Sequence, residues 1–136
     1  MFPILIVVIL IRSRTAWLQA VEKANGVIFV VDSTDTLRLS VAQVEIQKLA
    51  TSGVLGVRPL VIAANKQDLP SAMSIDQLSR ALGLASLPIS RWSIVPCSAV
   101  DGSGVFEVLQ QAVCLLRCSF VLYSLLNVGT SRIYCS

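Results

Sequence analysis

Residues 60–68 read Leu-Val-Ile-Ala-Ala-Asn-Lys-Gln-Asp, so an uninterrupted apolar run leads directly into a polar tetrapeptide. A short apolar run of this kind is typical of a strand that is buried on both faces of a parallel sheet. Such a strand delivers the residues that follow it to the carboxyl edge of the sheet, where ligands bind in open α/β folds. The stretch therefore predicts a parallel sheet with a polar binding loop at its edge.

Strands and helices alternate along the rest of the chain. Apolar runs predict strands at residues 2–11, 26–32, 60–65 and 92–97. Helical spacing and end signals predict helices at residues 17–25, 36–50 and 74–82, and from residue 105 onward. Strand–helix units of this length favour right-handed crossovers, so the predicted fold class is α/β, a parallel sheet with flanking helices. We expect residues 2–11 to pair beside residues 26–32.

The first two helices carry specific expectations about their ends and faces. The first is expected to end near Gly26, because glycine adopts the left-handed conformation of a helix stop. In the second, Leu37, Val41 and Val44 follow helical spacing and are expected to form its buried stripe. Asp35 is the expected cap of that helix.

The last two helices are marked by a capping pattern and by an apolar repeat. Ser74 and Gln77 stand three residues apart, as in a capping box, and Gly83 is the expected helix stop. The apolar residues expected to pack the final helix onto the sheet are Val105, Val108, Leu109, Ala112 and Leu116.

Composition limits the chemistry of the chain. With 136 residues and 54% hydrophobic content it has the material for the core of one domain. The net charge of +3 comes from scattered residues, so no nucleic-acid surface is expected. The chain has no histidine, which excludes His-based acid–base catalysis and most metal sites.

The cysteines and the chain ends bear on localisation. The four cysteines show no CxxC spacing, and Cys114 and Cys118, four residues apart on the expected final helix, are interpreted as buried thiols and not as a zinc half-site. Because the chain otherwise has the features of an intracellular domain, we expect its cysteines to be free thiols in a reducing compartment such as the cytoplasm. The apolar residues 1–11 are too short for a bilayer, which needs about 20, so no transmembrane segment is expected. Residue 2 is Phe, and the last four residues are not a prenylation box. No lipid anchor is encoded by those routes.

The polar residues at the strand ends together suit a guanine base. The carboxylate of Asp68 can accept hydrogen bonds from guanine N1–H and from the exocyclic amine, a paired edge that adenine lacks. Asn65 can bridge the base and neighbouring loops, and the methylenes of Lys66 can lie along the purine face. Ser98 and Ala99 follow the fourth strand, where a backbone amide can donate to guanine O6.

Longer stretches around these residues resemble one family. GVIFVVDSTD at residues 26–35, VIAANKQDLP at 61–70, ALGL at 81–84 and Cys-Ser-Ala at 97–99 are similar to the C-terminal two thirds of ADP-ribosylation-factor (Arf) and Arf-like small GTPases. The resemblance implies a P-loop-GTPase-like (Ras-like) sheet and a GTP/GDP switch that uses Mg²⁺. It also implies guanine-nucleotide recognition by Asn65, Lys66, Asp68, Ser98 and Ala99. The family recruits effector proteins at membranes, mostly in intracellular protein transport, so a location peripheral to membranes is also implied.

The phosphate-binding half of such a site is not found in this sequence. A P-loop reads Gly-x-x-x-x-Gly-Lys-Ser/Thr, but none of the three lysines, Lys23, Lys48 and Lys66, follows a glycine. The family's switch threonine and Asp-x-x-Gly-Gln segment are also missing. We therefore expect no hydrolysis, weak or lost GTP/GDP binding and no ligands for Mg²⁺, and we assign no catalytic residue.

These observations divide the chain and leave three interpretations open. Residues 1–117 are expected to form a partial Arf-like G domain, in which the resemblance starts at about residue 14 and residues 1–13 are a divergent apolar strand. Residues 118–136 are expected to be a poorly ordered apolar tail. The chain is then an Arf-like guanine-nucleotide-binding protein, a nucleotide-free Arf-like interaction module, or a truncated or alternative product without function.

Overall fold

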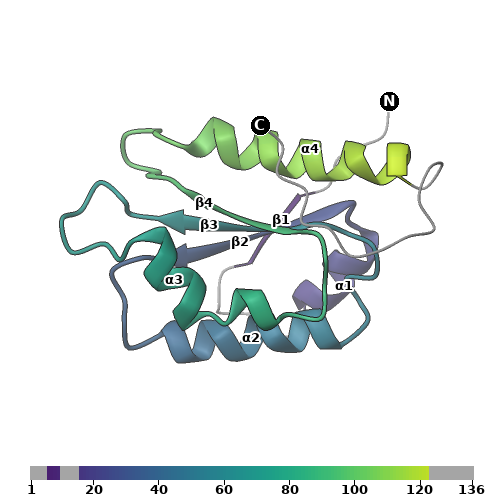
Figure 1. Ribbon diagram of the computed structural model, residues 1–136, viewed down its shortest axis with the longest axis horizontal. Helices are drawn as coiled ribbons and strands as arrows, with labels where there is room; N and C mark the ends of the chain where they lie inside the picture. The colour runs from purple at the N-terminus through teal and green to yellow at the C-terminus, as the bar shows by residue number, and fades with distance from the viewer. Residues whose placement is uncertain (1–5, 10–15, 123–136) are drawn as a thin grey trace.

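Four parallel strands form the centre of the protein. The computed structural model describes the backbone of residues 6–9 and 16–122 and the side chains of residues 18–116. Its strands are β1 (Ile6–Ile9), β2 (Gly26–Asp32), β3 (Leu60–Asn65) and β4 (Trp92–Pro96). They pair in the order β1-β2-β3-β4, and every pairing is parallel (Figure 1). The predicted α/β class is confirmed.

Helices cover both faces of the sheet. They are α1 (Ala16–Lys23), α2 (Leu39–Thr51), α3 (Ile75–Ala81), the 3₁₀ turn η1 (Leu84–Ser86) and α4 (Val105–Leu122). Figure 1 shows α4 alone on one face and the other helices on the opposite face. None of the helices in the described ranges is both long and apolar enough to cross a membrane.

Two apolar clusters account for this layering. Alternate residues of a strand point to opposite faces, so Phe29 and Ile62 pack with α2 while Ile28 and Val61 pack with α4. All four side chains are buried. Burial on both faces explains why β2 and β3 are continuous apolar runs in the sequence.

The pairing of the N-terminal segment with β2 is confirmed. Ile6 pairs with Gly26 and Ile9 with Phe29. The remainder of the expected strand, residues 2–5, 10 and 11, lies outside the described residues. Gly26 opens β2 and is absent from the glycines with positive φ, so the prediction of a left-handed helix stop is wrong there. A Cβ at Gly26 would lie 3.1 Å from Cγ of Pro59, so this glycine accommodates a close neighbour instead.

The start and the buried face of α2 differ from the prediction. Residues 36–38 form a turn, and the helix begins at Leu39 with Arg38 as its N-cap. Leu37 is 89% exposed and Val44 is 49% exposed. The residues that face the sheet are Leu39, Ala42, Ile46 and Leu49. Two apolar stripes interleave on this helix, and the longer one packs on the core.

The ends of the other helices follow their sequence signals more closely. Ser74 caps α3, its side chain accepts from Gln77 N at 3.3 Å, and the reciprocal bond completes the predicted capping box. Gly83 has φ 64°, as expected of a helix stop. Asp35 accepts from Arg38 N at 3.2 Å in the turn before α2, so it does not cap the first turn of that helix as predicted.

Helix α4 uses only part of its predicted apolar face. Val108, Ala112 and Leu115 are buried on the sheet, whereas Val105 and Leu109 are exposed. The helix continues to Leu122, five residues beyond the predicted domain boundary. Residues 123–136 of the predicted tail lie outside the described residues, and the domain boundary remains a prediction.

Candidate functional site

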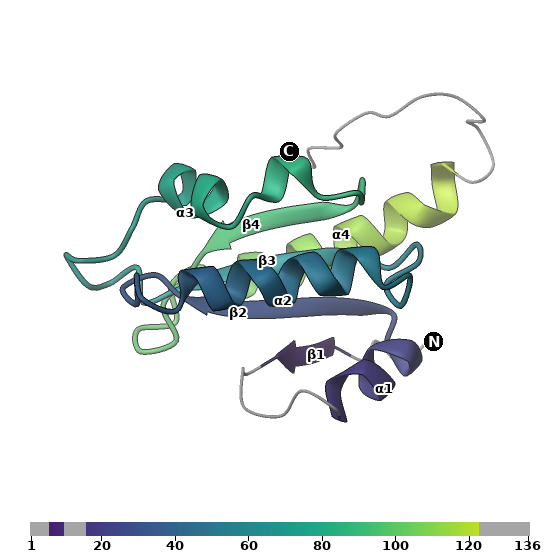
Figure 2. The ribbon, with the colours of Figure 1, turned by 90° about the horizontal axis from the view of Figure 1, so that it is seen from below.

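The loops that follow β2, β3 and β4 meet at the carboxyl edge of the sheet (Figure 2). β2 ends at Asp32, which lies in register with Asn65 at the end of β3. Backbone hydrogen bonds tie these ends together, from Ser33 N to Asn65 O at 3.1 Å and from Gln67 N to Cys97 O at 3.1 Å. Backbone hydrogen bonds alone therefore hold the three strand ends together.

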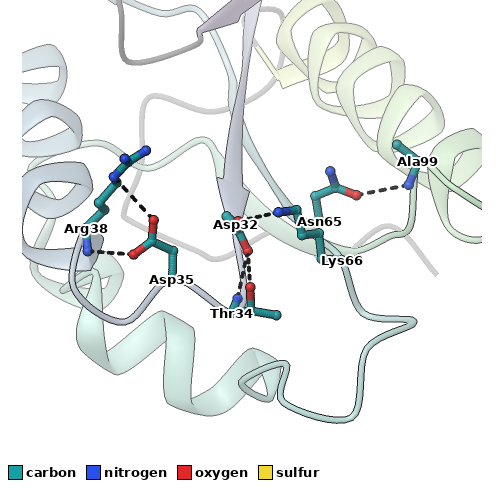
Figure 3. A network of polar contacts seen from close by, with 7 residues as sticks. All are labelled: Asp32, Thr34, Asp35, Arg38, Asn65, Lys66 and Ala99. Atoms are coloured by element: carbon teal, nitrogen blue, oxygen red, sulfur yellow. Dashed lines mark hydrogen bonds and ion pairs between the residues drawn. The ribbon is translucent and has the colours of Figure 1, made fainter.

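Asn65 joins the β3 and β4 loops. Its Oδ1 atom accepts a hydrogen bond from the backbone N–H of Ala99 at 2.9 Å (Figure 3). The sequence predicted that Asn65 bridges the base and neighbouring loops; this contact links the two loops, and the contact with the base stays a prediction. The amide of Ala99, which was predicted to face a ligand oxygen, is thus already engaged with Asn65.

Asp68 is held against the β4 loop from the other end of the motif. Its Oδ1 accepts from Ser98 Oγ at 2.8 Å, and Ser98 is fully buried. The backbone of Ser98 is itself fixed, because its N–H donates to Ser103 O at 2.8 Å and its carbonyl accepts from Gly102 N at 2.9 Å. No described hydrogen bond engages Oδ2 of Asp68, which leaves an exposed carboxylate oxygen on an anchored group.

The turn after β4 depends on one glycine. Gly104 has φ 71°, and a Cβ there would clash with the carbonyl oxygen of Pro96. Only glycine meets both conditions without strain. Gly104 thus lets the chain close back on β4 and present Ser98 and Ala99 to the β3 loop.

Lys66 points the other way, toward the end of β2. Its Nζ lies 2.6 Å from Asp32 Oδ2, and its φ of 67° places its backbone in the left-handed region (Figure 3). The hydrogen bond and charge of Asp32 raise the pKa of Lys66. Lys66 is consequently a charged, anchored side chain at physiological pH.

The Asp32 carboxylate accepts three hydrogen bonds. Its Oδ1 accepts from Thr34 N at 2.9 Å and from Thr34 Oγ1 at 2.7 Å, in addition to the Lys66 contact on Oδ2. Burial by itself would raise the pKa of Asp32, but the hydrogen bonds from Lys66 and Thr34 outweigh it and lower that pKa to about 2.

The role of Gln67 was missed by the sequence interpretation. Its Nε2 donates to Ser33 Oγ at 2.8 Å and to Met73 O at 3.0 Å, and Ser33 is fully buried. Gln67 therefore ties the motif to the β2 loop and to the approach of α3. The signal available in the sequence was weak, because this position is a spacer in the Asn-Lys-x-Asp pattern.

The structure thus brings all five predicted site residues to one edge but divides them between two sides. Asn65 and Asp68 contact Ala99 and Ser98 on the β4 side, while Lys66 contacts Asp32 on the β2 side. This arrangement fixes an amide and a carboxylate on the β4 side and an ammonium group on the β2 side of a loop of four residues.

Comparison with known proteins shows a match to one protein family. The sequence profile of the ADP-ribosylation factor family matches residues 11–114, which is more than half of the chain. The chain belongs to the ADP-ribosylation factor family. It is 39% identical over 95 residues to ADP-ribosylation factor-like protein 2 of Arabidopsis thaliana and 40% identical over 98 residues to ADP-ribosylation factor D of Dictyostelium discoideum. ADP-ribosylation factor J of the same amoeba is 36% identical over 96 residues.

The alignments cover a larger share of this member of the ADP-ribosylation factor family than of its relatives. They include 69%, 72% and 71% of this chain but only 51%, 45% and 51% of the respective relatives. The chain thus spans about half the length of the relatives it matches. Its sheet and flanking helices form part of a Ras-like P-loop GTPase fold.

Within residues 6–9 and 16–122, no three His, Cys, Asp or Glu side chains are grouped so that they could hold the metal ion that the resemblance implies. Asp32, the carboxylate at the end of β2, is already paired with Lys66.

The cysteines of this family member differ from the expected set of free thiols. Cys97, next to the site, is a buried free thiol, and burial raises its pKa. Cys114 is disulfide-bonded and partly buried, so the prediction of a free, buried thiol is wrong at that position. The expectation rested on the intracellular character of the rest of the chain, which does not determine whether an individual cysteine pairs.

Proposed function

We propose that this chain binds the guanine base of GDP or GTP at the carboxyl edge of its sheet. The residues that take part are Asn65, Lys66, Asp68, Ser98 and Ala99. The observation that carries the proposal is the pair of contacts from the motif to the β4 loop, Asn65 with Ala99 N and Asp68 with Ser98 Oγ. Together they hold an amide and a carboxylate in place.

In this proposal Asp68 selects the base. Its carboxylate accepts from guanine N1–H and from the exocyclic amine, while Ser98 keeps it oriented. Adenine offers an acceptor in place of N1–H, so it would leave the carboxylate facing a lone pair. The loss of one such hydrogen bond in a site costs about 1–3 kcal/mol, enough for clear discrimination. Asp68 thus acts in recognition and takes no part in bond breaking.

We propose further that the 136-residue chain does not hydrolyse GTP and binds GTP or GDP weakly. Phosphoryl transfer depends on positioning and on positive charge around the phosphates, which the P-loop lysine and Mg²⁺ supply in P-loop NTPases. The sequence has no Gly-x-x-x-x-Gly-Lys-Ser/Thr segment. Binding of the base alone is the activity that the described residues support.

The cellular role follows from the family and belongs to the same proposal. The relatives are ADP-ribosylation factors and a factor-like protein, and we propose that this chain shares their nucleotide-linked recruitment of effector proteins in membrane traffic. A cytoplasmic location, peripheral to membranes, accords with that role.

Replacing the base-selecting carboxylate tests the proposed function. Asp68→Asn should shift the preference of the chain from guanosine toward xanthosine, because an amide can donate to the xanthine 2-oxo group where the carboxylate accepted from an amine. Calorimetric titration of both nucleosides measures the shift, which we expect to be at least about tenfold in their affinity ratio.

A matched control is available on α3. Asp76→Asn makes the same chemical change at an exposed position in the first turn of that helix and should leave the ratio unaltered. An unchanged guanosine-to-xanthosine ratio in Asp68→Asn, with the wild-type chain binding guanosine, would show that Asp68 does not read the base.

A further inference from the structure

The Asp32 carboxylate is held by several hydrogen bonds, although base recognition by the motif does not itself require Asp32. It ends β2 directly opposite Asn65, and both of its oxygens are used, Oδ1 by two bonds from Thr34 and Oδ2 by Lys66. Its side chain is 34% exposed. The bonds from Thr34 fix the orientation of the carboxylate, so its other oxygen can hold the ammonium group of Lys66 in place.

Lys66 is the residue for which such an anchor matters most. It is the only non-glycine with positive φ among the described residues, and left-handed backbone is unfavourable for a non-glycine residue. The bonds from Leu69 N to Lys66 O and from Gln67 N to Cys97 O hold the backbone, each at 3.1 Å. The long side chain is held by the ion pair with Asp32.

We propose that Asp32 is a positioning residue of the guanine site, which holds the Lys66 ammonium so that the lysine methylenes are ordered as a surface for the purine ring. The inference rests on the proposed function. It assigns to the end of β2 an indirect part in ligand binding, through the contact of Asp32 with Lys66.

The expected benefit is preorganisation. A free lysine side chain loses rotamer freedom when a ring packs on it, and a lysine that is already tethered loses less. This difference corresponds to about three- to tenfold in the affinity for the base. The preorganised lysine favours every purine that packs on it to the same extent. Recognition of the exocyclic amine therefore depends on Asp68 alone.

The first test replaces Asp32 by its isostere. Asp32→Asn retains an oxygen for the Thr34 bonds but presents an amide to Lys66. We expect guanosine binding to weaken about three- to tenfold while the guanosine-to-inosine affinity ratio stays constant, since inosine lacks only the exocyclic amine. Asp35→Asn is the matched control, because Asp35 lies in the same loop, loses the same charge and pairs with Arg38. It should change guanosine binding less than about twofold.

A double-mutant cycle separates positioning from a general structural role. Lys66→Met keeps an unbranched side chain without the charge and should weaken guanosine binding by itself. In the Lys66→Met background, Asp32→Asn should cause no further loss, whereas an Asp32 that merely supports the fold would weaken binding again. Lys66→Met alters an exposed side chain, so it tests the inference even where Asp32→Asn lowers stability.

The outcomes distinguish the inference from the proposed function. If the wild-type chain binds no guanosine, the proposed function is wrong and the inference falls with it. If the wild type binds guanosine but either Asp32→Asn or Lys66→Met binds it equally well, only the inference is overturned. A loss in both single variants without a further loss in the double variant supports it.

Discussion

At the scale of single residues, the charge state of Asp32 links the site to the stability of the fold. The folded-state pKa of about 2 lies below the ordinary carboxyl value of 3.8. The ionised form is therefore favoured by folding, and its contribution is fully present above about pH 4 and disappears as the pH falls toward 2. The two side chains of the ion pair are 34% and 45% exposed, so solvent screening reduces the contribution.

This predicts a pH-dependent difference between wild type and Asp32→Asn. Urea unfolding at pH 7 should show the wild type more stable by about 1 kcal/mol, after the discount for screening. The difference should shrink as the pH is lowered from 4 to 2.5, because the carboxyl group of the unfolded chain, with its ordinary pKa of 3.8, takes up a proton in this range while the folded carboxyl, with a pKa of about 2, stays largely ionised. A difference that stays constant over this range would contradict the lowered pKa of Asp32.

The same scale shows what sequence patterns can predict about a site. Asn65, Asp68, Ser98 and Ala99 were found because each follows a recognisable apolar strand, and parallel strands bring their ends to one edge. The partnership of Lys66 with Asp32 was not predicted, since it depends on the register that sets Asp32 beside Asn65. Register is a property of two strands together and has no local signature.

At the scale of elements, helix α2 shows how the sheet selects a face. Its sequence carries two apolar stripes, and only the one through Leu39 and Ile46 is buried. Helical periodicity cannot rank two stripes of similar hydrophobicity, because both satisfy the spacing. The strands and the capping box of α3 were predictable since each depends on a continuous or local signal, as Ser74 and Gln77 illustrate.

Two matched substitutions test the face of α2. Leu39→Ala should lower the free energy of unfolding by about 2–4 kcal/mol, because Leu39 is only 7% exposed and its loss leaves a cavity. Leu37→Ala, the same change at an 89% exposed position in the turn before the helix, should cost less than about 0.5 kcal/mol. Urea denaturation of the two variants measures both values, and equal losses would indicate that the helix packs differently.

At the scale of the whole molecule, β1 completes the parallel sheet on one side. It pairs with β2 over four residues, from Ile6 opposite Gly26 to Ile9 opposite Phe29. Without it, the backbone groups of β2 on that side would lose their partners. β2 would then become an unprotected sheet edge, which favours aggregation.

Removal of this segment is therefore expected to abolish folding. Deletion of residues 1–11 should give a chain without a cooperative thermal transition, or an aggregating one. Deletion of residues 124–136 is the control, because it removes no described element and should retain the transition. A soluble, cooperatively unfolding chain without residues 1–11 would show that β1 is dispensable for the fold.

We propose that this chain, which spans about half the length of its ADP-ribosylation factor relatives, recognises guanine at the carboxyl edge of its sheet. Calorimetric titration of the 136-residue chain with guanosine and with adenosine tests it most directly. We predict saturable binding of guanosine and at least about tenfold weaker binding of adenosine, because only guanine pairs with the carboxylate of Asp68. Equal affinity for the two nucleosides, or no binding of guanosine, would contradict the claim.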